Sequence, residues 1–353
     1  MTTVSSGQTE TVSSGQIING TIVLSGGTQY ISAGGTASST LLSGGVISNY
    51  GSARGATLFN GGIEYIFLGG VDFSAIISNG GAQHVYAGGI ASSTTVFGGG
   101  QQTVSGGSTV SATLTNGGVQ RVSSGGSTTA TVFTGTNSQQ YVFNGGTTTG
   151  TVIIGNNSNQ YVSSGGIAVG TITQSASVQR IYTGGTAIDT QVRFSSWMAT
   201  SAGGVTSNAV ISSGGVGIAE TGALDIGTTI LFGGVDHIQT GATASNTVIS
   251  SGGTNSVYAG ATANGITVMN GGLLVTSGTN SGVTVSSGGR IIISGASIQG
   301  LTLMAGATQL HAIVSSGVVA SGEIVTPGWS QTVLSGGSTI STTLLNGVAQ
   351  YVA

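Results

Sequence analysis

Side chains that could carry acid–base chemistry are few in this chain. Its 353 residues include eight acidic residues and three histidines, and the tightest group is Glu220, Asp225, Asp236 and His237. Glycoside hydrolysis needs two carboxyl groups held roughly 5–9 Å apart. Nothing in the spacing of Asp225 and Asp236 enforces this. We therefore expect the acidic residues to be solvated surface charges, and we expect the chain not to be an enzyme.

Metal and nucleic-acid binding are also disfavoured by composition. His84, His237 and His311 stand alone, cysteine is absent, and Asp is too rare for calcium-binding repeats. The chain has five basic residues and a net charge of −3, so it lacks the basic patch that holds a phosphate backbone. No apolar run is long enough to span a bilayer. We expect no cofactor and no nucleic-acid partner.

Glycine doublets give the chain its organisation. Gly26–Gly27, Gly44–Gly45 and Gly61–Gly62 recur about every 19 residues, and a second doublet such as Gly34–Gly35 falls between them. Glycine suits tight corners because it reaches positive φ without a Cβ clash. Asn, the next best occupant of that region, often precedes the first doublet, as at Asn60. Each turn is thus expected to hold two short strands separated by glycine corners.

The strands between the corners alternate with a period of two residues. An aliphatic column three residues before the first doublet is expected to form the core, with a small or apolar column two residues earlier. A threonine column between them is expected to face outward. The aliphatic column includes Val23, Leu41, Leu58, Ile77, Val96, Leu114, Val132, Leu303 and Leu344; the small column includes Ala56, Ala75, Ala112 and Ala130.

Stacked turns of this kind form a quasi-one-dimensional solenoid. We predict an all-β fold, a right-handed parallel β-helix (β-solenoid) of about 19-residue turns, with the handedness taken by analogy. Residues 1–353 are expected to be one repeat domain and part of a longer protein, because the N-terminus does not resemble a signal peptide. Irregular turns are expected near 186–225, around Trp197, and near 315–330, around Pro327 and Trp329.

The repeat phrases resemble a known family. Residues 24–31, LSGGTQYI, and 34–41, GGTASSTL, are similar to the repeats of AIDA-type self-associating autotransporter adhesins. The resemblance implies a right-handed parallel β-helix outside a Gram-negative cell, extracellular or on the cell surface. It also implies autoaggregation, biofilm formation and adhesion, and O-heptosylation of repeat Ser or Thr by a dedicated transferase. Expected partners are a second copy, that glycosyltransferase, and surface glycans.

The candidate glycan acceptors are corner serines and strand threonines. A threonine column on a half-exposed strand can equally reflect β-propensity alone, or, less favoured, an ice-binding face. Bulky neighbours such as Leu24, Phe59 and Phe97 argue against ice binding; they form either an apolar strip for self-association or a second inward column. The candidate acceptors are Ser13, Ser14, Ser124, Ser164, Thr40, Thr95, Thr113 and Thr131.

A polar and aromatic column follows the first doublet by three residues, often preceded by Gln as in Gln29 and Gln83. It is either a surface ladder in which amides and rings stack between turns, or a stripe that docks another rod or a glycan. A glycan-binding or glycan-cleaving β-helix is the alternative function. The candidate interaction ladder is Tyr30, Tyr65, His84, Arg121, Tyr141, Tyr161, Arg180 and His237.

Overall fold

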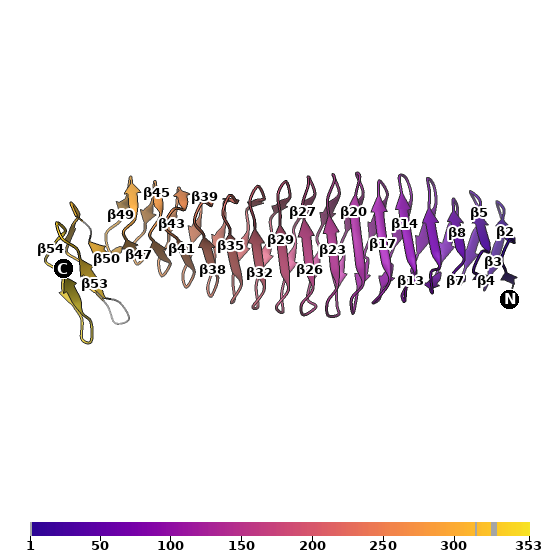
Figure 1. The fold of residues 1–353 in the computed structure, drawn as a ribbon, viewed down its shortest axis with the longest axis horizontal. Helices are drawn as coiled ribbons and strands as arrows, with labels where there is room; N and C mark the ends of the chain where they lie inside the picture. The colour runs from indigo at the N-terminus through magenta and orange to yellow at the C-terminus, as the bar shows by residue number, and fades with distance from the viewer. Residues whose placement is uncertain (1, 315, 326–329) are drawn as a thin grey trace. The chain divides into compact units, whose positions relative to one another are not determined.

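The computed structural model describes residues 2–314, 316–325 and 330–353. Over these residues the protein is all-β, with parallel strands stacked in about 18 turns of about 19 residues, which confirms the predicted β-solenoid (Figure 1). The right-handed winding stays a prediction. The chain divides into two compact units, Met1–Thr190 (unit 1) and Gln191–Ala353 (unit 2), and each unit is built from the same kind of turn.

Each turn contains three strands, where the glycine spacing predicted two. In unit 1, one turn consists of β10 (Thr57–Phe59), β11 (Ile63–Ile66) and β12 (Val71–Phe73). The next consists of β13 (Ile76–Ile77), β14 (Ala82–Tyr86) and β15 (Ile90–Ser92). The strands pair in parallel as β10–β13, β11–β14 and β12–β15. First, second and third strands of successive turns therefore build sheets A, B and C.

The two glycines of a doublet are needed for different reasons. Gly61, between sheets A and B, has φ 82°, where a side chain is strained. A Cβ on Gly62 would lie 2.6 Å from the carbonyl oxygen of Leu42 in the preceding turn, so the second glycine permits the close stacking of turns. The corner between sheets C and A is a single positive-φ residue, such as Ser74 at 61°. This third corner lacks a glycine doublet, and the sequence interpretation missed it.

Some corners replace the second glycine by a buried serine. Ser158 is fully buried, and its Oγ donates to the carbonyl oxygen of Gly135 at 3.0 Å. Ser196 takes the same place between β31 (Gln191–Val192) and β32 (Trp197–Thr200). The strands continue without interruption through 197–226, so the loop or bulge expected at Trp197 is not seen. Residues 315 and 326–329, with Pro327 and Trp329, lie outside the described residues.

The aliphatic core of sheet A lies three residues after the C–A corner, not at a fixed distance before the doublet. Ser39 and Ala130, both with positive φ, are followed by buried Leu42 and Phe133. The predicted core residues Leu41 and Val132 are only half-buried, because the A–B corner varies in length. Leu303 and Leu344, also assigned to this column, are each 43% exposed. The buried column in unit 1 is Val23, Leu42, Leu58, Ile77, Val96, Leu114, Phe133 and Ile153.

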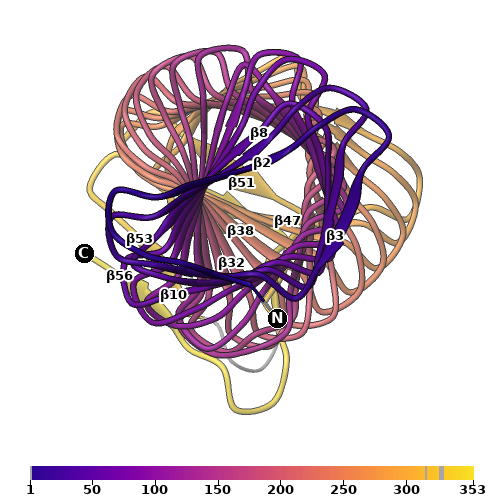
Figure 2. The ribbon, with the colours of Figure 1, turned by 90° about the vertical axis from the view of Figure 1, so that its right-hand side faces the viewer.

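The residue directly after the C–A corner also points inward. Ala56, Ala75 and Ala112 are buried there as predicted, while Ala130 sits on the corner itself with φ 56° and Thr131 replaces it inside. Viewed end-on in Figure 2, successive turns within each unit are rotated slightly relative to one another around a shared interior. Residues at the same strand position in successive turns therefore form a column along the solenoid, and a site repeated from turn to turn lies along such a column.

Candidate functional site

The inner face of sheet B in unit 1 carries an unbroken ladder of glutamines. Gln83, Gln102 and Gln120 are fully buried, as are Gln140, Gln160 and Gln179. From Gln102 onward, each Nε2 donates to the Oε1 of the glutamine one turn earlier, over 2.5–2.7 Å. The sequence interpretation put these amides on the surface with the rings. That was wrong, because successive strand residues face opposite sides and the amides occupy the inner one.

Buried threonines at the C–A corner complete the ladder. Thr131 Oγ1 donates to Gln120 Oε1 at 3.3 Å and Thr171 Oγ1 to Gln160 Oε1 at 3.0 Å. Each threonine follows its glutamine by 11 residues, a spacing that could have revealed the ladder in the sequence. Each of these glutamine Oε1 atoms thus accepts from the glutamine Nε2 of the next turn and from a threonine hydroxyl. Such a column is fully hydrogen-bonded without water, as buried polar groups require.

A carboxyl group ends each amide ladder on the side of lower residue number. Glu64 accepts from Gln83 at 2.9 Å, and Glu10 accepts from Gln29 at 2.7 Å. In unit 2, Asp236 accepts from Asn255 at 3.0 Å. A further amide at this end would have to find an acceptor for its own NH₂ group, whereas a carboxylate only accepts. The residue beside Glu64 in the preceding turn is the apolar Ile47.

Two of these end groups meet a second buried carboxyl group. Asp72 lies on β12, and Gln83 Nε2 donates both to its Oδ2, at 2.8 Å, and to Glu64. Burial raises the pKa of Glu64 to about 7. Burial, and then the charge of Glu64, raise the pKa of Asp72 well above its usual value. The pair is therefore stable inside the solenoid when it retains a proton.

Unit 2 also holds two interacting buried carboxyl groups, Asp225 on β36 (Leu224–Ile226) and Asp236 on β38 (Val235–Ile238), which accept from Thr228 and Asn255 respectively. Burial raises the pKa of Asp225 to about 6, and burial and the charge of Asp225 raise that of Asp236. The expectation that these acids are solvated was wrong for both and for Glu64, Asp72 and Glu323, all at most 3% exposed. Asp225 and Asp236 do meet, but inside. No substrate can reach them there, so the pair lacks the access that glycoside hydrolysis requires.

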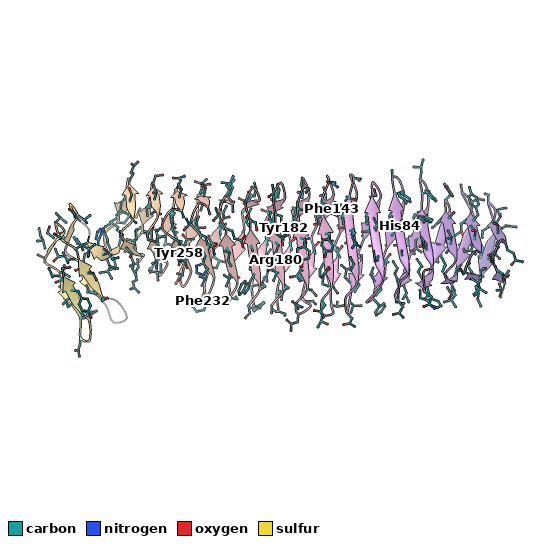
Figure 3. The ribbon with its side chains drawn as sticks, viewed as in Figure 1. His84, Phe143, Arg180, Tyr182, Phe232 and Tyr258 are labelled. Atoms are coloured by element: carbon teal, nitrogen blue, oxygen red, sulfur yellow. The ribbon has the colours of Figure 1, made fainter. Side chains whose placement is uncertain are left out.

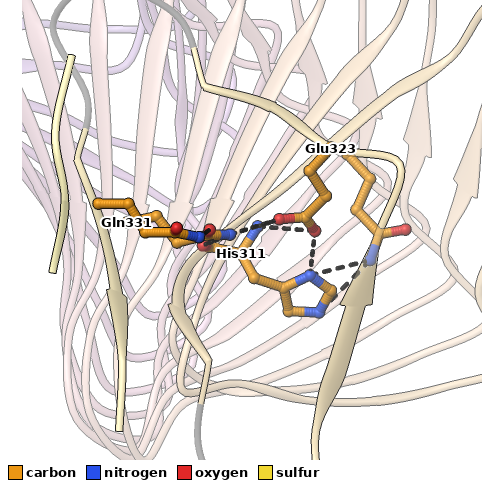
Figure 4. Close-up of polar contacts among 5 residues, drawn as sticks. His311, Glu323 and Gln331 are labelled. Carbon is orange, nitrogen blue, oxygen red and sulfur yellow. Dashed lines mark hydrogen bonds and ion pairs between the residues drawn. The ribbon is translucent and has the colours of Figure 1, made fainter. Parts of the chain in front are cut away.

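His311 also contacts a buried carboxyl group. Its Nδ1 contacts Glu323 Oε1, and its backbone N–H donates to the same carboxylate at 3.0 Å (Figure 4). Gln331 Nε2 donates to Glu323 Oε2 at 2.7 Å, and Gln331 Oε1 accepts from Gln350 Nε2. Glu323 thus ends a further amide ladder. Among the described residues, no group of three or more His, Cys, Asp or Glu side chains could hold a metal ion.

The predicted interaction ladder lies on the outer face of sheet B. Register joins Tyr30, Tyr65, His84, Arg121, Tyr141, Tyr161 and Arg180 in one column of unit 1, through Ser48 and Thr103. His237 occupies the matching strand position in unit 2, between Ile218 and Ser256. A second ring column, with Tyr50, Phe67 and Tyr86, runs beside the first. His84, Arg180 and Tyr182 are labelled in Figure 3.

The rings of this ladder stack on one another. Tyr65 and His84 have centroids 5.3 Å apart, Tyr50 and Phe67 4.7 Å, and the second pair is inclined by only 15°. Arg121 lies over the ring of Tyr141 at 5.5 Å. Faces that cover one another are not free to receive a sugar ring, which leaves mainly edges and hydroxyls outside. The geometry favours a stabilising surface ladder over a docking stripe.

The candidate glycan acceptors fall into three environments. Ser13, Ser14, Ser124 and Ser164 are exposed at corners, and the last two have positive φ. Thr95 and Thr113 are half-buried on the outer face of sheet A. Thr40 and Thr131, by contrast, are at most 2% exposed and donate to buried glutamines. These two were predicted to face outward; they lie inside, where a sugar has no room.

The bulky residues at the end of the sheet A strands face outward. Leu24, Phe97 and Met269 are 38%, 38% and 43% exposed. The alternative of an inward position holds at Leu42 and Phe133, which lie three residues after the C–A corner and so belong to the buried column. The outer face of sheet A therefore carries an apolar strip of the kind associated with protein contacts.

No family model matches the chain, and no match was found among curated proteins. Among solved structures, a fragment of TibA hyper-glycosylated by TibC matches with a TM-score of 0.59 and 29% identity, over 99% of this chain and 97% of that one. The predicted likeness to AIDA-type repeats is confirmed.

Two enzymes share only low similarity with this chain. The A-module of the mannuronan C-5 epimerase AlgE4 from Azotobacter vinelandii has a TM-score of 0.19 at 13% identity, over 81% of this chain and 91% of that one. An endo-xylogalacturonan hydrolase from Aspergillus tubingensis has a TM-score of 0.14 at 13% identity, over 86% and 95%. Neither likeness supports a comparison of chemistry.

No described helix is long and apolar enough to cross a membrane.

Proposed function

We propose that this chain is an adhesin-like repeat solenoid, extracellular or on the surface of a Gram-negative cell, that self-associates and carries O-linked heptose on exposed serines. The likeness to hyper-glycosylated TibA over 99% of the chain supports this proposal. So does the seclusion of Glu64, Asp72, Asp225 and Asp236, which leaves no reachable carboxyl pair for a glycan-cleaving enzyme. The chain presents surface to partners rather than a pocket to a substrate.

The observation that carries the glycosylation proposal is the exposure of corner serines on several turns. Ser124 and Ser164 project from corners whose backbone hydrogen bonds are already made with neighbouring turns. A sugar there extends into solvent without displacing a strand. Thr40 and Thr131 offer no such room, so modification of the folded chain is expected to leave them bare.

The test is intact-mass spectrometry of the full chain produced with and without a bacterial heptosyltransferase. We expect added heptose units with the transferase and their reduction in a variant with Ser13, Ser14, Ser124 and Ser164 changed to alanine. The matched control changes Thr40 and Thr131 to valine, which should leave the number of heptose units unchanged. An unmodified mass for the wild-type chain would remove glycosylation from the proposal.

Self-association is tested separately with microspheres coated with the full unglycosylated chain. We expect the coated spheres to cluster and spheres coated with an unrelated soluble protein of similar net charge to stay dispersed. Dispersed wild-type spheres at every coating density would contradict the adhesin half of the proposal while leaving the acceptor half intact.

A further inference from the structure

The outermost column of sheet A alternates between large and small residues from one turn to the next. Register places Ser43 between Leu24 and Phe59. Backbone hydrogen bonds from Ser78, Phe97 and Thr115 to the preceding turns continue the column. In unit 1 the column reads Leu24, Ser43, Phe59, Ser78, Phe97, Thr115, Thr134, Ile154 and Gln174, so the strict alternation runs from Leu24 to Thr115.

Unit 2 repeats the alternation with different residues. Backbone hydrogen bonds define the column by the same rule, with Leu231 bonded to Ile211 and Met269 to Ile249. Large side chains there are 37%, 43% and 51% exposed at Leu231, Met269 and Met304. From the start of unit 2 the column reads Arg193, Ser212, Leu231, Ser250, Met269, Ser286 and Met304. Leucine, phenylalanine and methionine serve equally, so the shared property is size.

An alternating column is complementary to itself. Turns stack about 4.8 Å apart, so large side chains recur about every 9.6 Å with a small residue between them. A second such face, shifted by one turn, places its large side chains in the spaces over Ser43 and Ser78. Interdigitation of this kind is how paired sheets pack their facing side chains.

Charge also favours contact between like faces. The two outward columns of sheet A in the described part of unit 1, from Ile22 to Gln174, contain apolar, Thr, Ser and Gln residues and no ionisable side chain. Two copies therefore meet without like-charge repulsion and without desolvating an ion. Sheet B presents Arg121 and Arg180 outward, and sheet C presents Arg54, which already covers the ring of Phe73 at 5.0 Å.

We propose that the outer face of sheet A is the surface through which two copies of this chain associate, large side chains of one copy filling the small-residue spaces of the other. This inference rests on the proposed self-association and assigns it to one face. Six rows about 4.8 Å apart and about 10 Å wide cover on the order of 300 Å². Because a standard interface buries about 800 Å² per partner, one contact of this size is weak. Many contacts between crowded chains supply the avidity.

The test measures which face becomes protected when chains associate. The chain contains no cysteine, so a single introduced cysteine reports on its own position. Ser78→Cys probes sheet A, and Thr103→Cys and Ser92→Cys are matched half-buried strand positions on sheets B and C. Each full-length variant is coated on microspheres, and its maleimide labelling rate is compared between clustered and dispersed spheres.

We expect clustering to slow labelling of Ser78→Cys roughly tenfold, as for a position in the water-excluded centre of an interface, and to leave the other two rates unchanged. Protection at Thr103→Cys or Ser92→Cys with Ser78→Cys unaffected would overturn the assignment while leaving self-association standing. Spheres that never cluster would overturn both.

A second pair of variants tests the shape argument. Ser78→Phe fills one space of the sheet A column, and Ser92→Phe adds the same ring to sheet C. Only Ser78→Phe is expected to raise the coating density needed for clustering, by at least a few fold. Equal effects of the two variants would refute shape complementarity as the basis of the contact.

Discussion

The two units are built from the same kind of backbone turn, but different side chains fill their interiors. In unit 1 the inner column of sheet B is a run of glutamines from Gln83 to Gln179. In unit 2 the same column changes from Asp236 and Asn255 to Leu274 and Ile291, within an apolar cluster that includes Ile249, Val268 and Val285. A solenoid turn thus accepts either self-satisfying amides or aliphatic packing, provided that neighbouring turns agree.

The aliphatic column of sheet A is common to both units, so a charge there should have the largest effect. Leu114 is fully buried, and Leu114→Asp should destabilise its region by about 5 kcal/mol, since it creates a cavity and buries a charge. Hydrogen exchange measured by mass spectrometry should show that backbone amides in residues 96–133 lose protection. Thr113→Asp, which faces outward on the same strand, should change little. Native protection in Leu114→Asp would refute the column.

The pH dependence of stability should also differ between the two units, with the next largest effect. The pKa of Glu64 rises from 4.5 to about 7 in the folded chain, so the folded state holds its proton longer than the unfolded state. Stability is therefore full below pH 4.5 and falls until about pH 7, on the order of 3 kcal/mol by linkage. For Asp225 in unit 2 the fall runs from pH 3.8 to about 6.

Hydrogen exchange between pH 4.5 and 8, corrected for the intrinsic exchange rate, should show this loss around Glu64. Glu64→Gln combined with Asp72→Asn should flatten the pH dependence there and leave the region of Asp225 unchanged. Protection that instead increases with pH around Glu64 would contradict the shared proton.

Breaking the amide ladder should have an intermediate effect. Gln120→Leu removes the acceptor used by Gln140 and Thr131 and the donor used by Gln102. Leaving buried polar groups unpaired should destabilise unit 1 by about 2–3 kcal/mol. The outward Arg121→Leu on the same strand is the control. Equal effects of the two substitutions on thermal unfolding would show that the ladder contributes nothing specific.

Extending the ladder in unit 2 should have the smallest effect. Asn255 Oδ1 is buried without a hydrogen-bond partner, and Leu274 lies beside it in the next turn. A glutamine at Leu274→Gln can donate to that oxygen, so we expect a loss of about 1 kcal/mol or less despite the buried amide. Leu274→Glu, which cannot donate when ionised, is the matched control and should be clearly worse. Equal losses would show that Asn255 does not accept.

The fold was predictable from the sequence because glycine corners and two-residue alternation leave few alternatives to stacked strands. The third strand was missed because the C–A corner is a single residue such as Ser74. Column positions were misplaced at Leu41 and Val132 because the A–B corner changes length, while distance from the C–A corner does not.

The interior of sheet B could not be predicted by the usual preference for apolar cores. In a pair such as Gln140–Tyr141, the more polar residue lies inside. An amide satisfies itself only through its copies in adjacent turns, a contact that no single repeat reveals. Glu64 and Asp72 were misjudged for the same reason, since their partner Gln83 belongs to the next turn.

The direction of the amide ladders has a consequence for how such chains grow and shorten. A turn with glutamine at the inner position accepts from one neighbour and donates to the other, so gene duplication can copy it, or deletion remove it, without leaving an unmatched group. Glu64 has no N–H group and only accepts when it is ionised, so an ionised copy placed mid-ladder would have nothing to donate. A turn with an acidic residue at this position therefore fixes where a run of duplicated turns begins, whereas the number of glutamine turns that follow is free to change during evolution.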